Sequence, residues 1–229
     1  IARHDPREIV LSEAIHADPA LARIWQESRA AIVPLAQAEL EPAAAERRLR
    51  EQYGVSTLEG FGQFTRAEIA AAGAVLLYIA RTQLAARPTL AVPTREDSGA
   101  TLAIDAATRA NLELTRTLSG ERTGSLLATI DRTVTANGAR LLAEHLAGPL
   151  TTLDAIARRH AAVAHLVDDG SLRGALREAL ARAPDLARAL SRTGLGRAGP
   201  RDLAAIRDGL AVAAQLGARL SAIPNLPDE

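Results

Sequence analysis

Histidine side chains are the groups in this chain best suited to acid–base or metal chemistry, because their pKa lies near neutrality and their ring nitrogens bind metal ions. The 229 residues contain five histidines and no cysteine. His160 and His165 are five positions apart, which turns them about 140° away from each other on a helix and prevents shared metal binding. His145 stands alone. The spacing therefore predicts no metal site. His160 lies on an apolar helical stripe, so we expect it to be a hydrogen-bonded core residue.

Gly194 to Gly199 follow the pattern G-x-G-x-x-G, which is typical of loops that bind dinucleotide phosphates. That chemistry needs a strand before the loop and an acidic residue about 20 positions later. Here Ser191 to Thr193 precede the loop in a helical context, and Arg219 stands near the acidic position. The chain has no lysine, so it also lacks the lysine of a phosphate-binding P-loop. These residues predict a break between two helices.

Adjacent charges could form two further kinds of site. Asp168 and Asp169 form an acidic pair, but they precede Gly170 and have no partner acid or nucleophile in sequence, which favours a turn. Two arginine clusters could bind phosphate, but acidic residues stand beside both, which favours solvated helix faces. The clusters are Arg47, Arg48 and Arg50 with Glu46 and Glu51, and Arg158 and Arg159 with Asp154.

Composition narrows the function classes further. The formal net charge is +0 and aromatic residues make up 2%, which does not favour a stand-alone nucleic-acid binder. The most apolar run, Ile69 to Ala80, is shorter than the ~17 to 25 residues that span a bilayer, and no secretory signal is evident. We expect a cytoplasmic protein. Because the chain begins at Ile1 and has no methionine, we also expect it to be a piece of a longer protein.

The first third of the chain has the pattern of a partial α/β unit. Apolar runs at Glu8–Leu11 and Ala31–Leu35 flank a helical stretch at Pro19–Ser28. A further helix is expected over Ala43–Gln52, because Pro42 suits a helix start and Gly54 a helix end. Trp25 is expected to lie in the core.

A longer helix is predicted to link this unit to the next. Thr65 and Glu68 form a T-x-x-E capping box, after which apolar and small residues recur at helical spacing as far as Arg87, where Pro88 ends the helix. The prolines and polar residues between Pro88 and Ala100 indicate a domain boundary.

From Ala100 onward the pattern predicts almost pure helix. Thr151 and Asp154 suit a helix start, and shorter helices are expected over Ser171–Arg182 and Pro184–Arg192. Two apolar stripes step by three and four and predict buried faces of long rods. The stripes are Leu153, Ile156, His160, Val163 and Val167, and then Leu203, Ile206, Leu210, Ala213 and Leu220. The predicted fold class is mainly α, with long amphipathic helices preceded by a partial α/β unit.

Several blocks of the second half follow a known pattern. Ile104 to Leu114 read I-D-A-A-T-R-A-N-L-E-L, which closely resembles the L-D-x-x-T-R-x-N-L-E-L signature that opens the core, or lever, domain of the MutS family. Gly124 to Leu142 resembles the T-L-L-x-x-L-D-x-T-x-T-x-x-G-x-R-L-L pattern that follows. Pro149-Leu150, Asp185 to Arg188 and Gly196 to Leu203 are similar to the P-L, D-L-E-R and G-R-A-x-P-R-D-L blocks.

The resemblance also covers the first half. Tyr53 to Gly62 and Ala71 to Gln83 look like the end of the MutS connector domain. The resemblance therefore implies that residues 1–88 are the C-terminal part of a connector and residues 89–229 the N-terminal part of a helical core or lever domain. Ala103, Asn137 and Ala187 depart from the pattern, which affects local packing alone.

Twelve positions carry the family signature and are expected to have structural roles. They are Asp105, Thr108, Arg109, Asn111, Glu113, Thr135, Gly138, Arg140, Arg197, Pro200, Arg201 and Asp202.

The implied function is mechanical: the segment links the ATPase state to mismatch recognition and DNA clamping, and is not itself an enzyme. In the family, a Phe-x-Glu motif reads the mismatch and a P-loop domain uses ATP and magnesium, and both lie outside these residues. The longer protein is implied to bind mismatched double-stranded DNA and a MutL-like partner and to form a homodimer, with no membrane contact.

Two alternatives stay open from the sequence. One is a helical interaction scaffold of a MutS-like paralogue that acts in recombination. The other is an enzyme that uses His145, His160 or His165, which would require bound zinc or a loss of activity when a histidine is replaced.

Overall fold

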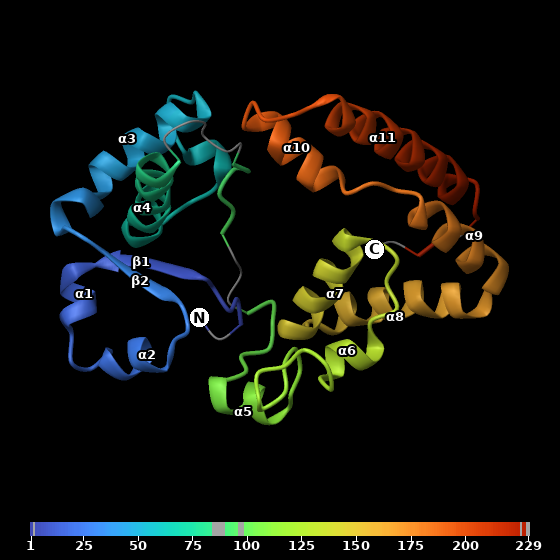
Figure 1. Ribbon diagram of the computed structural model, residues 1–229, viewed down its shortest axis with the longest axis horizontal. Coiled ribbons are helices and arrows are strands. Elements are labelled where there is room, and N and C mark those ends of the chain that lie inside the picture. Colours follow the sequence, from blue (N-terminus) through green and yellow to red (C-terminus); the bar gives the residue numbers. More distant parts are fainter. Residues whose placement is uncertain (2, 84–89, 96–98, 225, 228–229) are drawn as a thin grey trace. The chain divides into compact units, whose positions relative to one another are not determined.

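The structure is a computed structural model that describes residues 1, 3–83, 90–95, 99–224 and 226–227. The chain divides into two compact units, here called the N-terminal unit (residues 3–96) and the C-terminal unit (residues 97–229). Figure 1 labels their elements. Among the described residues, none of the helices combines the length and the apolar composition needed to cross a membrane. The fold is mainly helical with one small sheet, as the pattern predicts.

The N-terminal unit is the partial α/β unit that the sequence predicts. Its elements are β1 (Glu8–Ser12), α1 (Glu13–Ala17), α2 (Ala22–Glu27), β2 (Ala31–Leu35), the 3₁₀ turn η1 (Gln37–Leu40), α3 (Pro42–Tyr53), the 3₁₀ turn η2 (Glu59–Phe61) and α4 (Arg66–Thr82). β1 and β2 pair in parallel, with Ile9 beside Ile32 and Leu11 beside Pro34. Leu11 and Leu35 are buried, whereas Trp25 on α2 is partly exposed.

Pro34 determines which edge of this sheet can accept another strand. The Ala31 amide donates to the Arg7 carbonyl at 2.9 Å. The backbone amide and carbonyl groups of the odd-numbered residues of β2 therefore point toward β1, and those of the even-numbered residues point away from it. Proline has no amide hydrogen, so the outer edge of β2 lacks a donor at position 34. β2 is therefore suited to be an edge strand, and a further strand would pair more readily with β1.

The helix pair α3 and α4 is closely packed. Pro42 begins α3, and Gly54, at φ 64°, ends it in the left-handed conformation that glycine adopts most readily. Ala45 and Leu49 of α3 are buried. A Cβ atom added at Gly73 of α4 would lie 2.3 Å from the Ala45 Cβ atom. A glycine at position 73 therefore allows the two helices to approach this closely.

Helix α4 begins as predicted and ends earlier. The Glu68 amide donates to the Thr65 hydroxyl at 3.2 Å, and the Thr65 amide donates to the Glu68 carboxylate at 2.6 Å, which completes the capping box. The helix was expected to reach Arg87, but it ends at Thr82 with Gln83 as its C-cap. The Thr82 hydroxyl donates to the Tyr78 carbonyl, a local bond that competes with helix continuation. The predicted segment from Leu84 to Pro88 lies outside the described residues.

The C-terminal unit contains seven helices among the residues that the structure describes. They are α5 (Ala106–Asn111), α6 (Leu126–Ile130), α7 (Ala136–Ala147), α8 (Leu153–Asp168), α9 (Gly170–Ala181), α10 (Leu186–Gly194) and α11 (Pro200–Ser221). Residues 112–125 form turns, so the expectation of almost pure helix after Ala100 is wrong here. The chain reverses because Glu113 adopts φ 47° and its carbonyl accepts a hydrogen bond from the Leu126 amide at 3.0 Å.

Helix α8 differs from the prediction both in its first residue and in the face that is buried. Its N-cap is Thr152, because the Thr151 hydroxyl instead donates to the Gly99 carbonyl. Leu153, Val163 and Val167 of the predicted stripe are 80%, 57% and 63% exposed, and His160 is exposed as well, not a core residue. The less exposed residues of α8 are Ala155, Ile156, Arg159, Ala162, His165 and Leu166. At 100° per residue, that face is turned by roughly 110° from the apolar stripe.

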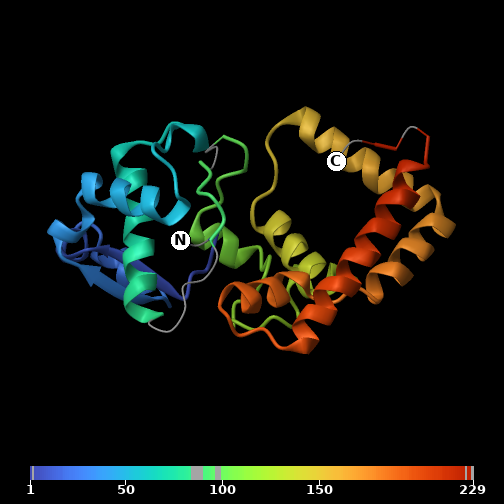
Figure 2. The ribbon, with the colours of Figure 1, turned by 90° about the horizontal axis from the view of Figure 1, so that it is seen from above.

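Helix α11 packs against α10 and α9, as Figure 2 shows from above. Gly209 is buried in α11, and a Cβ atom added there would lie 2.5 Å from two carbon atoms of the Leu186 side chain of α10. Leu203 and Leu210 of the predicted second stripe are 58% and 60% exposed, so that stripe is also not the buried face. Contact between helices is made through a glycine, which an apolar pattern does not reveal.

Candidate functional site

The candidate residues for metal and acid–base chemistry do not gather into a site. His145 lies in α7, and His160 and His165 lie on different sides of α8. Within the described ranges, no group of three or more histidine or acidic side chains is arranged to hold a metal ion. Asp169 of the acidic pair serves as the N-cap of α9, accepting a hydrogen bond from the Leu172 amide at 2.8 Å. Asp168 is the last residue of α8, so Asp169 alone lies between the two helices, and the junction is shorter than the predicted turn.

The glycine-rich segment Gly194 to Gly199 connects α10 to α11, as predicted for a break between helices. Gly196 has φ 63°, a conformation that suits glycine. The Gly199 amide donates to the Asp202 carboxylate at 2.8 Å, and Arg192 donates to the same carboxylate at 3.0 Å. A carboxylate of the chain thus lies at the start of α11, where a dinucleotide loop would hold phosphate.

These contacts also hold the pKa of Asp202 below its ordinary value. The hydrogen bond from the Gly199 amide is the largest cause, followed by the bond from Arg192. Asp202 is therefore held as an anion, and its carboxylate occupies the amide group that another anion would need at this helix start.

The first signature block forms a tight set of local hydrogen bonds. Asp105 is the N-cap of α5: its carboxylate accepts from the Thr108 amide at 2.9 Å and from the Thr108 hydroxyl at 2.6 Å. The Thr108 hydroxyl bond is the largest cause of the lowered pKa of Asp105. The Glu113 carboxylate accepts from the Leu118 amide at 2.7 Å. Asn111 is the last residue of α5, and Arg109 on the same helix is partly buried.

The second signature block begins α7. Thr135 is its N-cap, accepting a hydrogen bond from the Gly138 amide at 2.9 Å. A Cβ atom added at Gly138 would lie 2.9 Å from the Thr135 hydroxyl oxygen. A glycine at position 138 therefore leaves room for the capping side chain.

Two ion pairs connect signature residues to other segments of the C-terminal unit. Arg140 of α7 lies 3.3 Å from the carboxylate of Asp185, the N-cap of α10. Arg192 of α10 lies 3.0 Å from the carboxylate of Asp202 on α11. Arg192 also donates to the Arg197 carbonyl at 3.0 Å. Pro200 is the first residue of α11, and Arg201 is exposed.

Three stabilising interactions in the C-terminal unit were not predicted from the sequence: the Ser125 cap, the ion pair of Arg122 with Asp131, and the contacts of Arg192. Ser125 is fully buried, and its hydroxyl caps α6 by accepting from the Ala128 amide. A serine directly before an apolar run is a local signal that could have indicated this cap. The ion pair between Arg122 and Asp131, at 2.7 Å, and the Arg192 contacts join residues that no local pattern connects.

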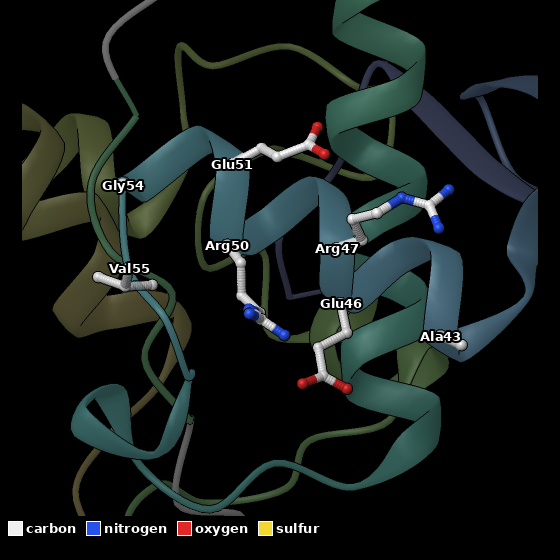
Figure 3. Close-up of a pocket in the computed structure, with 7 residues that line it drawn as sticks. All are labelled: Ala43, Glu46, Arg47, Arg50, Glu51, Gly54 and Val55. Carbon is white, nitrogen blue, oxygen red and sulfur yellow. The ribbon is translucent and has the colours of Figure 1, made fainter.

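A broad surface depression lies along α3, with a volume of about 590 Å³. Figure 3 shows its charged lining residues Glu46, Arg47, Arg50 and Glu51 spread along the outward side of the helix, with Glu46 and Arg50 pointing in a similar direction. Arg47, Arg50 and Glu51 are exposed, which agrees with a solvated face. Arg48 differs, because it donates to the Glu39 carbonyl at 3.0 Å.

The fold and these contacts define a helical scaffold with a small α/β unit, in which the signature side chains cap helices and join segments. Its sequence matches the family model of MutS domain II over residues 1–91 and that of MutS domain III over residues 107–228. The chain belongs to the MutS family.

Curated relatives agree with this assignment. The chain is 55% identical over 221 residues to a DNA mismatch repair protein MutS from Azorhizobium caulinodans, which covers 95% of this chain and 24% of that protein. It is 51% identical over 228 residues to the protein of that name from Nitrobacter winogradskyi, covering 100% of this chain and 26% of that protein. The chain thus spans about a quarter of the length of these relatives.

Proposed function

We propose that this chain is the mechanical link of a mismatch repair protein, comprising the end of the connector (residues 1–88) and the first part of the lever (residues 89–229). In this proposal it transmits the nucleotide state of a distant ATPase domain to the segments that read the mismatch and hold DNA. Two packed units that respond to ligands bound elsewhere are sufficient for such coupling.

The observation that carries the proposal is the use of the signature residues. Asp105 and Thr135 cap helices, Arg140 joins α7 to the start of α10, and Asp202 joins the start of α11 to Arg192. Side chains that form such contacts fix how helices are arranged relative to one another. A unit held in this way can move as a body and pass on a displacement.

Exposed apolar faces in the C-terminal unit give further support. Leu153, Val163 and Val167 on α8 and Leu203 and Leu210 on α11 are each more than half exposed. Large apolar surfaces of this kind mark contacts with other protein segments. Since the relatives are about four times as long as this chain, we propose that further helices of the same protein cover these faces.

ATP and magnesium belong to the proposed longer protein and do not fit the residues of this segment. The chain has no lysine for a P-loop, and the glycine-rich segment presents the Asp202 carboxylate at the helix start where a phosphate would bind. We therefore propose that this segment performs no catalysis. Mismatched double-stranded DNA, a MutL-like protein and a second copy of the same protein are the proposed partners of the longer protein.

The recombination alternative is less well supported. The relatives at 51% and 55% identity are named as DNA mismatch repair proteins. A preference of the complete protein for mismatched over perfectly paired duplex would favour repair, and equal affinity for both would favour the recombination paralogue.

The ion pair between Arg140 and Asp185 provides a test in the complete protein. Arg140→Asp and Asp185→Arg each place two like charges together, which should weaken the contact between α7 and the start of α10. We expect each single variant to hydrolyse ATP normally without DNA but to lose most of the ATP-induced release from a mismatched duplex. The double variant restores opposite charges but not the cap that Asp185 provides for α10, so it should recover only part of the release.

A matched control is the pair Arg182 and Glu178, at 3.2 Å, which lies at the end of α9 and joins no second helix. Arg182→Glu should leave release unchanged. A second variant, Ile156→Pro, breaks α8 at a cost of about 3 kcal/mol and should also uncouple ATP from release. Normal coupling in the folded Arg140, Asp185 and Ile156 variants would refute the proposed lever.

A further inference from the structure

Asn137 and Gly138 form an Asn-Gly dipeptide in the first turn of α7. In such a dipeptide the glycine amide nitrogen can attack the carbonyl carbon of the asparagine side chain, because glycine has no Cβ atom to hinder the approach. Asn137 is exposed, so water reaches its side chain. Asn137 also occupies a variable position of the T-x-x-G pattern, which makes the dipeptide a property of this chain and not of the MutS signature.

The side-chain carbonyl group of Asn137 is polarised by a neighbouring charge. Arg140, about one helical turn further along α7, donates from its Nη2 atom to Asn137 Oδ1. A guanidinium group that donates to a carbonyl oxygen stabilises the negative charge that develops on that oxygen when the carbon is attacked. Arg140 therefore activates the Asn137 side chain toward a nucleophile.

Thr135 restrains the nucleophile. The Gly138 amide donates to the Thr135 hydroxyl at 2.9 Å, which holds the amide nitrogen away from the Asn137 side chain. The first amides of a helix have no acceptors within the helix, so the first turn depends on its cap. The Ala139 amide adds a bond to the Thr135 carbonyl at 3.0 Å. Opening of the Thr135 cap therefore determines when the Gly138 nitrogen is free to react.

We propose that Asn137 and Gly138 form a self-modifying site, at which the Asn137 amide is converted to a carboxylate when the Thr135 cap opens. Hydroxide takes the proton of the Gly138 amide, and the nitrogen attacks Asn137 Cγ. The new bond between nitrogen and Cγ forms, the bond between Cγ and Nδ2 breaks, and Nδ2 takes a proton from water and leaves as ammonia. Water then opens the cyclic imide to aspartate or isoaspartate. Overall, one amide and one water become a carboxylate and an ammonium ion.

The product changes the charges around Arg140. The same Nη2 atom that donates to Asn137 lies 3.3 Å from the Asp185 carboxylate. A carboxylate at position 137 would stand three residues before Arg140, a helical spacing at which opposite charges attract. It would therefore compete with Asp185 for Arg140 and weaken the contact between α7 and the start of α10. This modification requires neither ATP nor DNA, so it goes beyond the proposed mechanical role.

Mass spectrometry of the complete protein, incubated folded at neutral pH, tests the site. We expect Asn137 to lose its amide, whereas Asn111, which is followed by Leu112, should keep its own. Thr135→Ala should accelerate the loss at Asn137 about fivefold, the factor that corresponds to the ~1 kcal/mol of a typical helix cap. Thr135→Ser retains a hydroxyl cap and should leave the rate close to that of the unchanged protein.

Matched variants separate the roles of the cap and of Arg140. Asp169→Ala removes the N-cap of α9 and should leave the rate at Asn137 unchanged. Arg140→Met and Asp185→Asn both remove the ion pair, but Arg140→Met also removes the donor to Asn137. The rate should therefore be about twofold to fivefold lower in Arg140→Met than in Asp185→Asn, as expected for one exposed charged contact.

Loss of the amide at Asn137 that is no faster than at Asn111 would overturn the proposal. Equal rates in Thr135→Ala and the unchanged protein would overturn it as well. So would equal acceleration by Asp169→Ala, because general loosening of the unit would then explain the reaction.

The consequence for Arg140 has its own measurement. Asn137→Asp supplies the product carboxylate directly. In this background, a double-mutant cycle with Arg140→Met and Asp185→Asn should give about half the coupling energy that the same cycle gives in the unchanged protein. Equal coupling energies in the two backgrounds would contradict the competition for Arg140.

Discussion

Replacing Gly73 by alanine tests how closely α3 and α4 are packed. The added Cβ atom would lie 2.3 Å from the Ala45 Cβ atom and 2.7 Å from the Ala45 Cα atom. Both distances are far below an ordinary carbon contact of about 3.5 to 4.0 Å. The second contact is with backbone, so a side-chain rotation cannot relieve it. The two helices must therefore move apart by roughly 1 Å.

The expected change in the free energy of unfolding is the difference between a packing cost and a gain in helix propensity. Overpacking costs about 1 to 3 kcal/mol, and a separation of 0.5 to 1 Å removes about a quarter to a half of the dispersion attraction across the contact. Alanine stabilises a helix interior by up to about 1 kcal/mol relative to glycine. We expect a net destabilisation of about 2 kcal/mol. For a unit of this size, that lowers the melting temperature by about 8 to 16 °C.

Thermal unfolding followed by circular dichroism measures this change. Gly174→Ala on α9 and Gly217→Ala on α11 are matched controls, because an added Cβ atom meets nothing within 4 Å at either position. Both controls should be stabilised by about 0.5 to 1 kcal/mol, so the same substitution has opposite signs at different helix positions. If Gly73→Ala were as stabilising as the controls, the close approach of α3 and α4 would be wrong.

Further substitutions and conditions test other parts of the structure. Removing the α7 cap with Thr135→Ala should destabilise the C-terminal unit by about 1 kcal/mol in urea titrations, whereas Thr135→Ser should retain most of the stability. Gly209→Ala places a Cβ atom 2.5 Å from the Leu186 side chain and should lower the melting temperature, and the partner change Leu186→Ala should restore part of the loss. In the folded protein the pKa values of Asp185 and Asp202 lie below their ordinary values. Their stabilising contribution is therefore present above the unfolded pKa, near 4, and is lost as the pH falls through the folded pKa values. Asp202→Asn should consequently show a smaller loss of melting temperature than the unchanged protein between about pH 4 and pH 2. Pro34→Val supplies an amide donor at the outer edge of β2 and should increase self-association in light scattering, whereas no change would mean that this edge is covered.

Local signals predicted several helix boundaries, but not the end of α4 or the N-cap of α8. The Thr65 and Glu68 capping box and the stop at Gly54 each depend on residues within four positions, so the sequence contains the information. The break at Gly194 to Gly199 was predictable for the same reason, since the residues before it favour a helix over a strand. The α/β character of the first unit also followed from short apolar runs.

Burial within the C-terminal unit was not predictable in the same way. The stripe that includes Leu153, Val163 and Val167 has the spacing of a buried face, but a stripe is buried by whatever packs against it. The face of α8 that is less exposed contains alanines and Arg159, which hydropathy ranks below the stripe. Contacts through Gly73 and Gly209 were hidden too, because a glycine has no side chain for a pattern to detect.

The ion pairs that connect different helices depend on tertiary structure. Arg140 and Asp185 are 45 positions apart in the chain, and no periodicity relates them. The resemblance to MutS marked Arg140 and Asp202 as signature positions but did not identify the residues that they contact.

The carboxylate at the start of α11 has a consequence for ligand competition. Because Asp202 is attached to the same helix, its carboxylate stays at the Gly199 amide, 2.8 Å away, whatever the concentration of free phosphate or nucleotide in solution. A free anion must displace an anion that never diffuses away. The Asp202 carboxylate thus competes with phosphate for the glycine-rich segment, and in the proposed mechanical role this would keep the segment unresponsive to the surrounding nucleotides.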